Sequence, residues 1–357
     1  MQVKAAVTLG YQQPFVIKDV EVAPTGKDEI LVKIVATGVC HTDAVMRDNP
    51  GVVPMPAILG HEGAGIVASV GEAVSGIRVG DHVVLSYAAC HHCNHPSACE
   101  DFNTLNFGGR REDGTTPYRL GDQDLSLFFG QSSFSQYVVT RASNAVVVDP
   151  EVDLTLLGPL GCGIQTGSGT VLNRLKPVVG ESLVVFGCGA VGLSAIMAAK
   201  LTGCSQIIAV DIHASRLALA GELGATHQIN GKEQDAVAVI KQITGKGAHY
   251  AVETTGVSAI VLQAVHAVKP LGTVAIVGFT GDITLNVQND LMAEGKSLVG
   301  VIEGDAVPAL FIPLLVQLYK QGKFPIDKLI ARYPLADINQ AFADSASGKV
   351  IKPVVVM

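Results

Sequence analysis

SLVVFGCGAVG, residues 182–192, is the stretch that decides the fold of this 357-residue chain. An apolar run that predicts a buried strand passes directly into Gly187, Gly189 and Gly192, which fit the pattern G-x-G-x-x-G. Asp211 ends the next apolar run, 19 residues after the last of these glycines. Such glycines let backbone amides approach a pyrophosphate at a helix N-terminus, and the acid accepts hydrogen bonds from a ribose. Because strand, helix and acid are in register, the stretch predicts a dinucleotide site rather than a glycine-rich turn made only for packing.

The same acid indicates which dinucleotide binds. A carboxylate at Asp211 would repel a 2′-phosphate, so the sequence favours NAD over NADP. Arg216 lies one turn further on, and its positive charge could soften that preference.

The sequence that follows repeats this unit of strand and helix. Apolar runs of strand length alternate with helical stretches of about a dozen residues, which predicts a parallel, doubly wound sheet. The strands are expected at 183–186, 206–211, 226–230, 250–256 and 273–278, and the helices at 213–224, 234–244 and 258–268. After this repeat, a further helix is expected at 308–322, and it leads to a final strand.

The first 150 residues have a different texture. They are rich in Val, Gly and Pro, and turn residues interrupt their short apolar runs, which is typical of an irregular antiparallel β domain. The runs are 29–38, 65–71, 81–86 and 134–140, and KPVVVM at the C-terminus predicts a final strand.

Composition excludes several classes of function. The net charge of −7 and the absence of a long Lys/Arg run argue against nucleic acid or an anionic membrane as a partner. The apolar stretch 182–203 is interrupted by the glycine turn, so it predicts a buried βα unit rather than a membrane span. The N-terminal residues lack a signal-peptide apolar region, and the seven cysteines therefore favour metal binding over a disulfide framework. We expect a cytoplasmic protein.

Four residues in three separate segments offer metal ligands. GVCHTD contains Cys40, LGHEGAG contains His61 and Glu62, and GPLGCGIQTG contains Cys162. Two thiolates and one imidazole, with one position left open, form the ligand set of a catalytic zinc. Their wide separation in the sequence means that spacing alone does not establish the site.

A family resemblance connects these segments. GHEGAGIVASVGEAV, residues 60–74, is similar to the G-H-E-x2-G-x5-G-x2-V signature of zinc-containing medium-chain alcohol dehydrogenases, and the similarity runs end to end. FFGQSSFSQY, GPLGCGIQTG and GKFPIDKL resemble the bacterial aryl (benzyl) and allylic alcohol branch. The resemblance implies an α/β protein with a GroES-like, mainly-β catalytic domain at 1–163 and 303–357, and a Rossmann NAD-binding domain at 164–302.

The resemblance also assigns roles around the metal. It implies that Cys40, His61 and Cys162 hold the catalytic zinc and that Glu62 is a nearby carboxylate that can bind it transiently. Asp43 resembles the acid that orients the ligand histidine, a contact that fixes the tautomer of the ring.

Further roles concern the proton and the cofactor. Thr42 resembles the hydroxyl that takes the proton of the alcohol, and His41 and Lys352 resemble basic residues near the cofactor pyrophosphate. Many relatives end the proton relay in a histidine at the position of Val45, so the proton is expected to leave by the cofactor ribose and His41 or by solvent. The residues expected to line the nicotinamide are Thr166, Thr254, Val277 and Phe279.

The resemblance implies reversible oxidation of a primary alcohol, aromatic or allylic, to the aldehyde with NAD and zinc. Zinc-free quinone or enoyl reductases lack the three-ligand set, and polyol or secondary-alcohol dehydrogenases usually replace the third thiolate with a carboxylate. An alternative of a different class is a non-catalytic NAD-binding structural or sensing protein. Relatives are dimers or tetramers, so we expect a homo-oligomer whose ligand is a small alcohol or aldehyde.

A second cysteine cluster lies at Cys90, Cys93 and Cys99. Family members often carry a structural zinc in a lobe patterned C-x2-C-x2-C-x7-C, whereas this lobe is shorter and has the pattern C-x2-C-x5-C. Two interpretations stay open. A fourth ligand from His92, His95 or Asp101 completes a structural zinc site, or the site is a remnant that no longer closes around metal.

Overall fold

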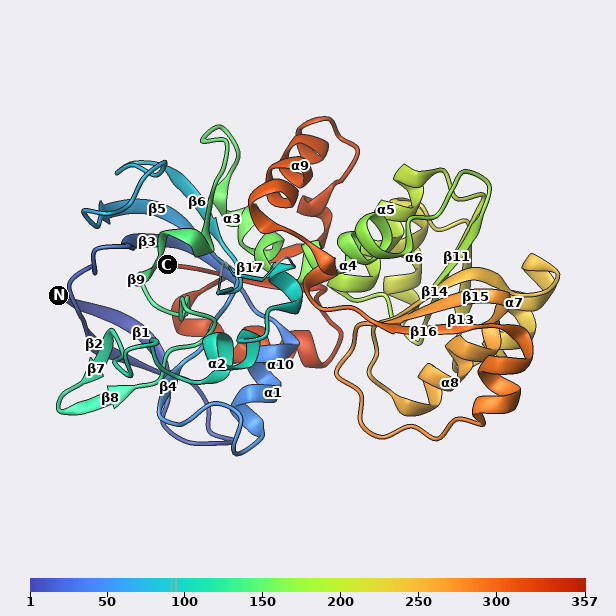
Figure 1. Ribbon diagram of the computed structural model, residues 1–357, viewed down its shortest axis with the longest axis horizontal. Helices are drawn as coiled ribbons and strands as arrows, with labels where there is room; N and C mark the ends of the chain where they lie inside the picture. The colour runs from blue at the N-terminus through green and yellow to red at the C-terminus, as the bar shows by residue number, and fades with distance from the viewer. Residues whose placement is uncertain (91, 94) are drawn as a thin grey trace. The chain divides into compact units, whose positions relative to one another are not determined.

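The computed structural model describes residues 1–90, 92–93 and 95–357, and these form two compact units (Figure 1). Unit 1 consists of Met1–Cys162, Val307–Lys320 and Ile326–Met357, and unit 2 consists of Gly163–Ala306 and Gln321–Pro325. The second division of the chain thus falls at 306/307, a few residues after the position expected from the sequence, and a short stretch of the C-terminal part returns to unit 2.

Over the described residues, the strands of unit 1 form two sheets. One has the order β4-β1-β2-β7-β8, and the other has the order β10-β6-β5-β3-β18-β17 with β9 also paired to β3. Their pairings are antiparallel except for β17 with β18, so the predicted antiparallel β domain is confirmed. The strands are β1 (Gln2–Thr8), β2 (Val16–Val22), β3 (Glu29–Gly38), β4 (Ala57–Ile58), β5 (Gly63–Val70), β6 (His82–Leu85), β7 (Tyr118–Leu120), β8 (Gln123–Leu125), β9 (Tyr137–Arg141), β10 (Ala145–Val147), β17 (Ile330–Pro334) and β18 (Lys352–Val356).

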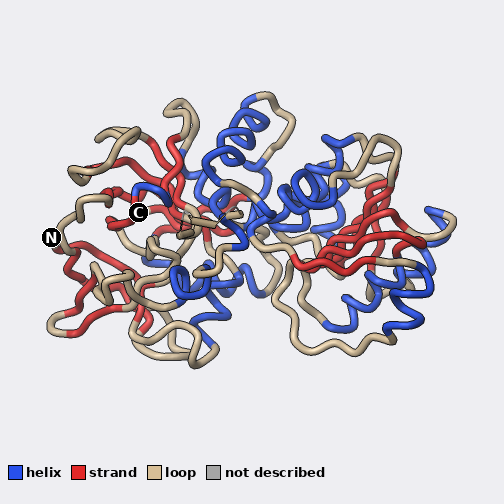
Figure 2. Tube along the Cα trace, viewed as in Figure 1, coloured by secondary structure: helices blue, strands red, loops and turns tan. Residues whose placement is uncertain are grey.

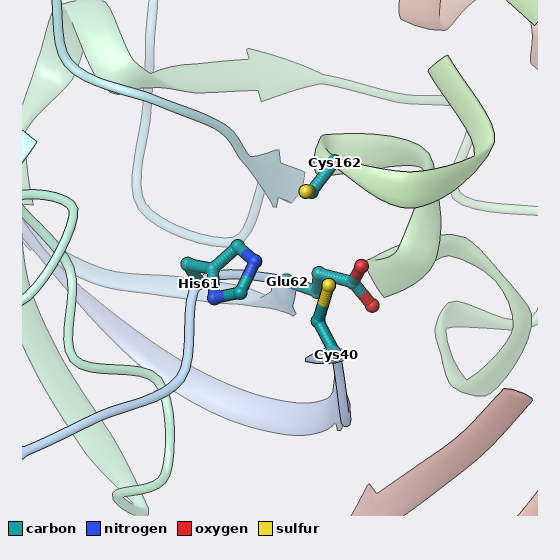
Figure 3. Close-up of side chains that lie close together, drawn as sticks. All are labelled: Cys40, His61, Glu62 and Cys162. Carbon is teal, nitrogen blue, oxygen red and sulfur yellow. The ribbon is translucent and has the colours of Figure 1, made fainter. Parts of the chain in front are cut away.

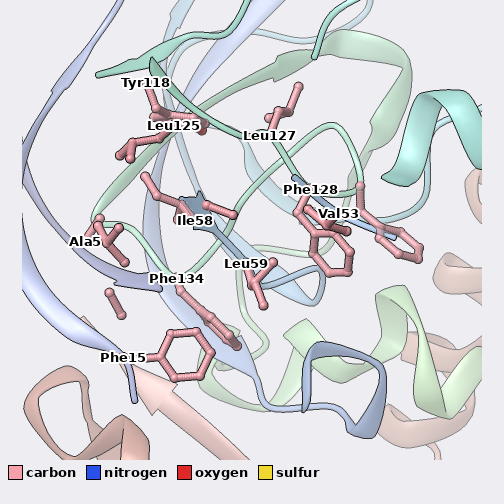
Figure 4. Packing of buried hydrophobic residues seen from close by; sticks show 14 of the residues in the cluster. Ala5, Phe15, Val53, Ile58, Leu59, Tyr118, Leu125, Leu127, Phe128 and Phe134 are labelled. Atoms are coloured by element: carbon pink, nitrogen blue, oxygen red, sulfur yellow. The ribbon is translucent and has the colours of Figure 1, made fainter. Parts of the chain in front are cut away.

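Five α-helices of the described residues belong to the same unit. They are α1 (His41–Asp48), α2 (Phe102–Phe107), α3 (Leu154–Leu157), α9 (Pro308–Lys320) and α10 (Ile338–Ala346). The main core of unit 1 packs aromatic and branched side chains from both halves of the sequence (Figure 4). Phe15, for example, contacts Phe134 edge-on at 5.5 Å and stacks on Phe342 at 5.0 Å between ring centroids.

Strand β3 positions the site of unit 1. Seven of the ten residues of its sequence EILVKIVATG are buried, as suits a central strand. It pairs with β5, β9 and β18, so that residues just beyond its end meet residues just before β5 and at the start of β18.

Unit 2 is built on a parallel six-stranded sheet of order β13-β12-β11-β14-β15-β16. All of its pairings are parallel, which confirms the predicted doubly wound sheet. The strands are β11 (Ser182–Phe186), β12 (Gln206–Asp211), β13 (His227–Asn230), β14 (Ala248–Glu253), β15 (Val268–Ile276) and β16 (Ser297–Gly300), and the helices are α4 (Gly163–Gly169), α5 (Ala190–Thr202), α6 (Ala214–Leu223), α7 (Ala236–Thr244) and α8 (Ser258–Ala267).

The helices of unit 2 cover its sheet. Helix α5 contacts α6, and α7 contacts α8, with the red strands of Figure 2 running between the two pairs. The apolar stretch 182–203 is β11 followed by α5, as its glycines predicted. Among the helices described, none has the length and apolar character to cross a membrane.

Candidate active site

Four potential metal ligands from three segments converge in unit 1. The sulfurs of Cys40 and Cys162, a ring nitrogen of His61 and a carboxylate oxygen of Glu62 all lie within 4.8 Å of one another. Figure 3 shows both sulfurs and the imidazole pointing into one space, with the carboxylate beside it. The structure therefore brings together the four residues that the sequence could only propose separately.

Local structure explains how each ligand arrives. Cys40 is the N-cap of α1, and His61 and Glu62 immediately precede β5. Cys162 follows the tight turn Gly158–Gly161, where the carbonyl oxygen of Leu85 would lie 2.0 Å from a Cβ on Gly161. Only glycine lets these two backbones approach so closely, and this approach brings Cys162 to the end of β6.

Asp43 fixes the orientation of the imidazole. This fully buried carboxylate lies 3.0 Å from His61 Nδ1 and also accepts the backbone N–H groups of Gly60 and Cys40, at 2.9 and 3.1 Å. With Nδ1–H donating to Asp43, the lone pair of Nε2 faces the sulfurs. That Nε2 is buried and has no hydrogen-bond partner among the described residues. A buried nitrogen of this kind beside two sulfurs fits a zinc ion.

Electrostatics favour the charged forms of Cys40 and His61. Hydrogen bonding with Cys162 lowers the pKa of Cys40 well below its usual value, and the Lys352 ammonium contributes to the same shift. Burial opposes protonation of His61, but the Asp43 carboxylate and the Cys40 sulfur together outweigh it and raise the pKa of His61 well above its usual value. The site thus stabilises a thiolate beside an imidazolium, and a divalent cation can replace the proton between them.

Glu62 takes part in an ion pair that the sequence did not predict. Its Oε1 lies 2.7 Å from Lys352 Nζ, which also donates to the carbonyl oxygen of Val39 at 3.1 Å. Both side chains are buried. Burial raises the pKa of Glu62 to about 7, although the Lys352 ammonium opposes that shift. Lys352 therefore lies against the metal-site carboxylate, and its expected part at the cofactor pyrophosphate stays a prediction.

The residues expected to move the proton lie at the start of α1. Thr42 is half-buried, and its Oγ1 lies 3.6 Å from the sulfur of Cys40. His41, the preceding residue, is exposed to solvent, and Val45 lies about one turn after Thr42 on the same helix. The hydroxyl thus reaches the ligand cluster, while its neighbour faces outward.

The second cysteine cluster also forms. The sulfurs of Cys90, Cys93 and Cys99 lie within 4.8 Å of one another, with 3.2 Å between the first two. Each sulfur accepts one backbone N–H, from His92, Glu100 and Cys90 respectively, at 3.3 to 3.5 Å. Within the described part of the chain, His92, His95 and Asp101 do not join this group.

In unit 2 the three glycines of the G-x-G-x-x-G pattern have different structural roles. Gly187 is left-handed, with φ of +92°, and makes the turn out of β11. A Cβ on Gly192 would lie 1.8 Å from the carbonyl oxygen of Gly187, so this glycine lets α5 pack on the turn. A Cβ on Gly189 would meet nothing within 4 Å, which leaves open space at the N-terminus of α5. Space beside a helix N-terminus fits a pyrophosphate.

Backbone N–H groups fix the position of the Asp211 carboxylate beside this loop. One carboxylate oxygen accepts the N–H of Cys188 at 2.6 Å, and the other accepts those of Ile212 and His213 at 2.7 and 2.9 Å. Arg216 lies in the first turn of α6, close in sequence to this carboxylate. The acid at the end of β12 and the empty space near Gly189 fit the adenosine half of a dinucleotide.

The residues expected at the nicotinamide lie at several element ends. Thr254, Val277 and Phe279 follow β14 and β15, so they share the carboxyl edge of the sheet with the glycine turn. Thr254 donates from its hydroxyl to the carbonyl oxygens of Phe186 and Gly187, at 2.9 and 3.1 Å. Thr166 is buried in α4, and its hydroxyl lies 3.5 Å from the Glu303 carboxylate.

The sequence did not indicate how buried polar side chains brace the ligand segments. Gln131 hydrogen-bonds the peptide groups on both sides of Glu62, and the Ser86 hydroxyl donates to the carbonyl of Gly161, next to Cys162. The stretch FFGQSSFSQY resembled one branch of a family, but nothing in it marked Gln131 as a bridging side chain.

Comparison with known proteins agrees with this geometry. Residues 26–150 match the family of alcohol dehydrogenase GroES-like domains, and residues 190–320 match the zinc-binding dehydrogenases. Geraniol dehydrogenase from Castellaniella defragrans is 43% identical over 99% of this chain and 97% of its own length.

Solved structures are similar over the full chain. Benzyl alcohol dehydrogenase from Acinetobacter calcoaceticus is 46% identical, with a TM-score of 0.96 over 100% of this chain and 99% of the other. An alcohol dehydrogenase zinc-binding domain protein from Burkholderia ambifaria is 49% identical, with a TM-score of 0.97 over the same shares. Together with the GroES-like and Rossmann architecture, these similarities show that the chain belongs to the zinc-containing medium-chain alcohol dehydrogenase family.

Proposed function

We propose that this protein is an NAD- and zinc-dependent dehydrogenase that oxidises a primary alcohol bearing an aromatic or allylic group to its aldehyde. The observation that carries the proposal is the buried group of Cys40, His61 and Cys162, whose ligand atoms converge within 4.8 Å. Two thiolates and an imidazole bind zinc while leaving a coordination position for substrate.

The chain's own residues would then have separate tasks. When bound, zinc supplies a Lewis acid that lowers the pKa of an alcohol, and NAD supplies the acceptor for hydride. Cys40, His61 and Cys162 would hold the metal, and Asp43 keeps the imidazole in the tautomer that binds it. Glu62 lies beside the ligands as an additional carboxylate.

Proton removal is assigned to Thr42. Its hydroxyl lies 3.6 Å from the Cys40 sulfur, beside the cluster of potential ligands, and would accept the proton of an alcohol bound there. Because Val45 cannot carry a proton, we propose that the proton passes from Thr42 towards the exposed His41 or directly to solvent.

The substrate class rests on relatives and on the surroundings of His61. Proteins named geraniol dehydrogenase and benzyl alcohol dehydrogenase are 43% and 46% identical to this chain. Phe129 stacks on the His61 ring at 4.6 Å between centroids, and Phe128 meets it edge-on at 5.4 Å. These two aromatic contacts make the surroundings of His61 apolar, which favours an apolar alcohol over a polyol.

The test is an alcohol panel with the purified protein. We expect turnover of benzyl and allylic terpenoid alcohols with NAD, a much lower rate with NADP, and a rate that falls as zinc is removed and returns when it is added. A polyol preferred over every aromatic and allylic alcohol would contradict the substrate class. NAD binding without turnover of any alcohol would instead favour a structural or sensing role.

A further inference from the structure

Gln131 is a buried amide whose side-chain groups bond to backbone near the metal ligands. Its side chain is fully buried. Oε1 accepts the N–H of Gly63 at 3.1 Å, and Nε2 donates to the carbonyl oxygens of His61 and Ser86, both at 3.1 Å. One amide thus bonds the peptide groups on both sides of Glu62 and joins them to Ser86, the residue that follows β6.

The same network reaches the third ligand. Ser86 Oγ donates to the carbonyl oxygen of Gly161 at 2.7 Å, and Gly161 directly precedes Cys162. Hydrogen bonds therefore connect His61 to Gln131, Gln131 to Ser86, and Ser86 to Gly161. The side chains of Gln131 and Ser86 are fully or almost fully buried. This network links two ligand segments that are far apart in the sequence.

The segment that carries Gln131 is itself strained and well anchored. Phe129 and Ser132 are left-handed, with φ of 51° and 54°, a conformation that is unfavourable for residues other than glycine. Phe129 stacks on His61, and Ser133 hydrogen-bonds Thr37, near the end of β3, at 2.7 Å. The surrounding contacts hold this conformation, which aims the amide at the ligand peptides.

We propose that Gln131 is a positioning residue for the metal centre, acting on the backbone of His61 and, through Ser86, on the turn before Cys162. The inference rests on the proposed function, because it concerns the same zinc site. Preorganised ligands bind metal more tightly and release it more slowly than ligands that must be ordered on binding. An amide suits this position because it both donates and accepts, whereas a carboxylate would face the two carbonyl oxygens with no proton to give.

The experiment measures metal release from each site separately. Cadmium replaces zinc in the folded protein, and cadmium NMR separates a site with two thiolates from one with three while excess chelator removes the metal. We expect Gln131→Met to release catalytic-site metal about tenfold faster than the wild type. The conservative Gln131→Glu variant should also release it faster, since it keeps the shape but loses both donations.

Asn106 provides a matched control. It is another buried amide of unit 1, accepting the N–H of Ala88 and donating to the carbonyls of Ala88 and Phe102, at 2.8 to 3.0 Å. Asn106→Leu removes the same number of buried hydrogen bonds without touching the peptides of the catalytic ligands. We expect its catalytic-site metal release to match the wild type, with an unfolding transition lowered as in Gln131→Met.

The outcomes are distinguishable. A wild-type rate in Gln131→Met, or equal acceleration in Asn106→Leu, overturns the positioning role. If Gln131→Met does not fold, the decision passes to Ser86→Ala, which removes the hydroxyl that donates to Gly161 and should still accelerate release. A wild-type rate in that variant overturns the proposal. A wild-type protein that binds no metal at Cys40, His61 and Cys162 refutes the proposed function itself.

Discussion

At the scale of single residues, the site depends on groups that act in pairs. Asp43 orients His61, Lys352 neutralises Glu62, and Thr42 lies beside Cys40. Each pair is buried or half-buried. Removing one member therefore leaves the other without its partner in a low-dielectric environment, where water cannot fully replace the lost interaction. Substitutions here should therefore have larger and more specific effects than at the surface.

Thr42→Val tests the proton transfer. Valine keeps the shape of threonine but has no hydroxyl to accept the proton, so we expect kcat for alcohol oxidation to fall about 10²- to 10⁴-fold. NAD affinity, measured by fluorescence titration, should be unchanged, and Thr42→Ser should recover most of the rate. Near-normal turnover in the valine variant would refute the relay role of Thr42.

Lys352→Met tests the buried ion pair. Glu62 would lose the ammonium at 2.7 Å while staying buried, so we expect the free energy of unfolding of the metal-free protein to fall by about 3–5 kcal/mol. Its carboxyl pKa, already raised to about 7 by burial, should rise further. Denaturant unfolding of Lys352→Met, Glu62→Gln and the double variant measures the coupling, and additive losses would show that the pair is not coupled.

At the scale of elements, the glycine turn between β11 and α5 contains one glycine needed for packing and another that leaves space for a ligand. Gly192 is required for packing and Gly189 is not, because only the former would place a Cβ against backbone. A residue pattern that looks uniform in the sequence therefore contains positions with different physical demands.

Two alanine substitutions should separate these demands. In Gly192→Ala the new Cβ would lie 1.8 Å from the carbonyl oxygen of Gly187, so we expect a loss of about 1–3 kcal/mol in unfolding free energy. Gly189→Ala should leave stability within about 0.5 kcal/mol and weaken NAD binding at least about tenfold. Thermal unfolding and calorimetric titration measure the two effects. Unchanged NAD affinity in Gly189→Ala would show that the open space is not where the pyrophosphate binds.

A histidine that bonds the start of β11 should make the stability of the protein depend on pH. His249 Nδ1 accepts the N–H of Ser182 at 3.1 Å, a bond that protonation of Nδ1 would abolish. Burial, together with the nearby Lys269, lowers the pKa of His249 below its usual 6.5. The unfolded chain therefore binds the His249 proton more tightly than the folded chain does. The stabilisation by neutral His249 is complete above pH 6.5 and is lost as the pH falls through the lower pKa of the folded state.

Replacing this histidine isolates its share of the pH effect. We expect the midpoint of thermal unfolding to fall less steeply between about pH 7 and pH 5 in His249→Asn than in the wild type. Parallel slopes for the two proteins would show that His249 does not contribute to acid sensitivity.

At the scale of the whole molecule, local pattern predicted much of the fold. Strands β3 and β12 have the bounds that their apolar runs indicated, 29–38 and 206–211. Strand β15 begins at Val268, five residues before the expected start, because α8 passes into it without an intervening loop and its pairing with β14 contains a bulge. The sequence KPLG is typical of a turn, so the sequence did not indicate that the strand begins before it.

The candidate site was predictable only in part. The cysteines, His61 and the glycine pattern carry chemistry that is visible in the sequence, and the structure brings the expected ligands together. Lys352 and Glu62 are 290 residues apart, and no local period links them. Gln131 was equally hidden, since a glutamine shows its bridging function only when the carbonyls that it bonds have been placed.

Metal content tests both cysteine sites at once. The three sulfurs of the lobe formed by Cys90, Cys93 and Cys99 lie within 4.8 Å of one another, and each accepts a backbone N–H, so we expect the lobe to hold metal and the protein to contain two zincs per chain without added metal. Cys162→Ser should lose one zinc and all turnover. Cys93→Ser should lose the other zinc while turnover persists. One zinc in the wild type, unaffected by Cys93→Ser, would show that the lobe does not hold metal.

The convergence of Cys40, His61 and Cys162 also has a consequence for biosynthesis. The ribosome delivers Cys162 roughly 100 residues after His61, a delay of about 5–20 s at ordinary elongation rates. The lobe cysteines emerge within that interval, so a nascent chain presents three clustered thiols to the cell's metal pool before its catalytic ligand set is complete. Metallation should therefore proceed in the order of translation, with the lobe first and the catalytic centre last.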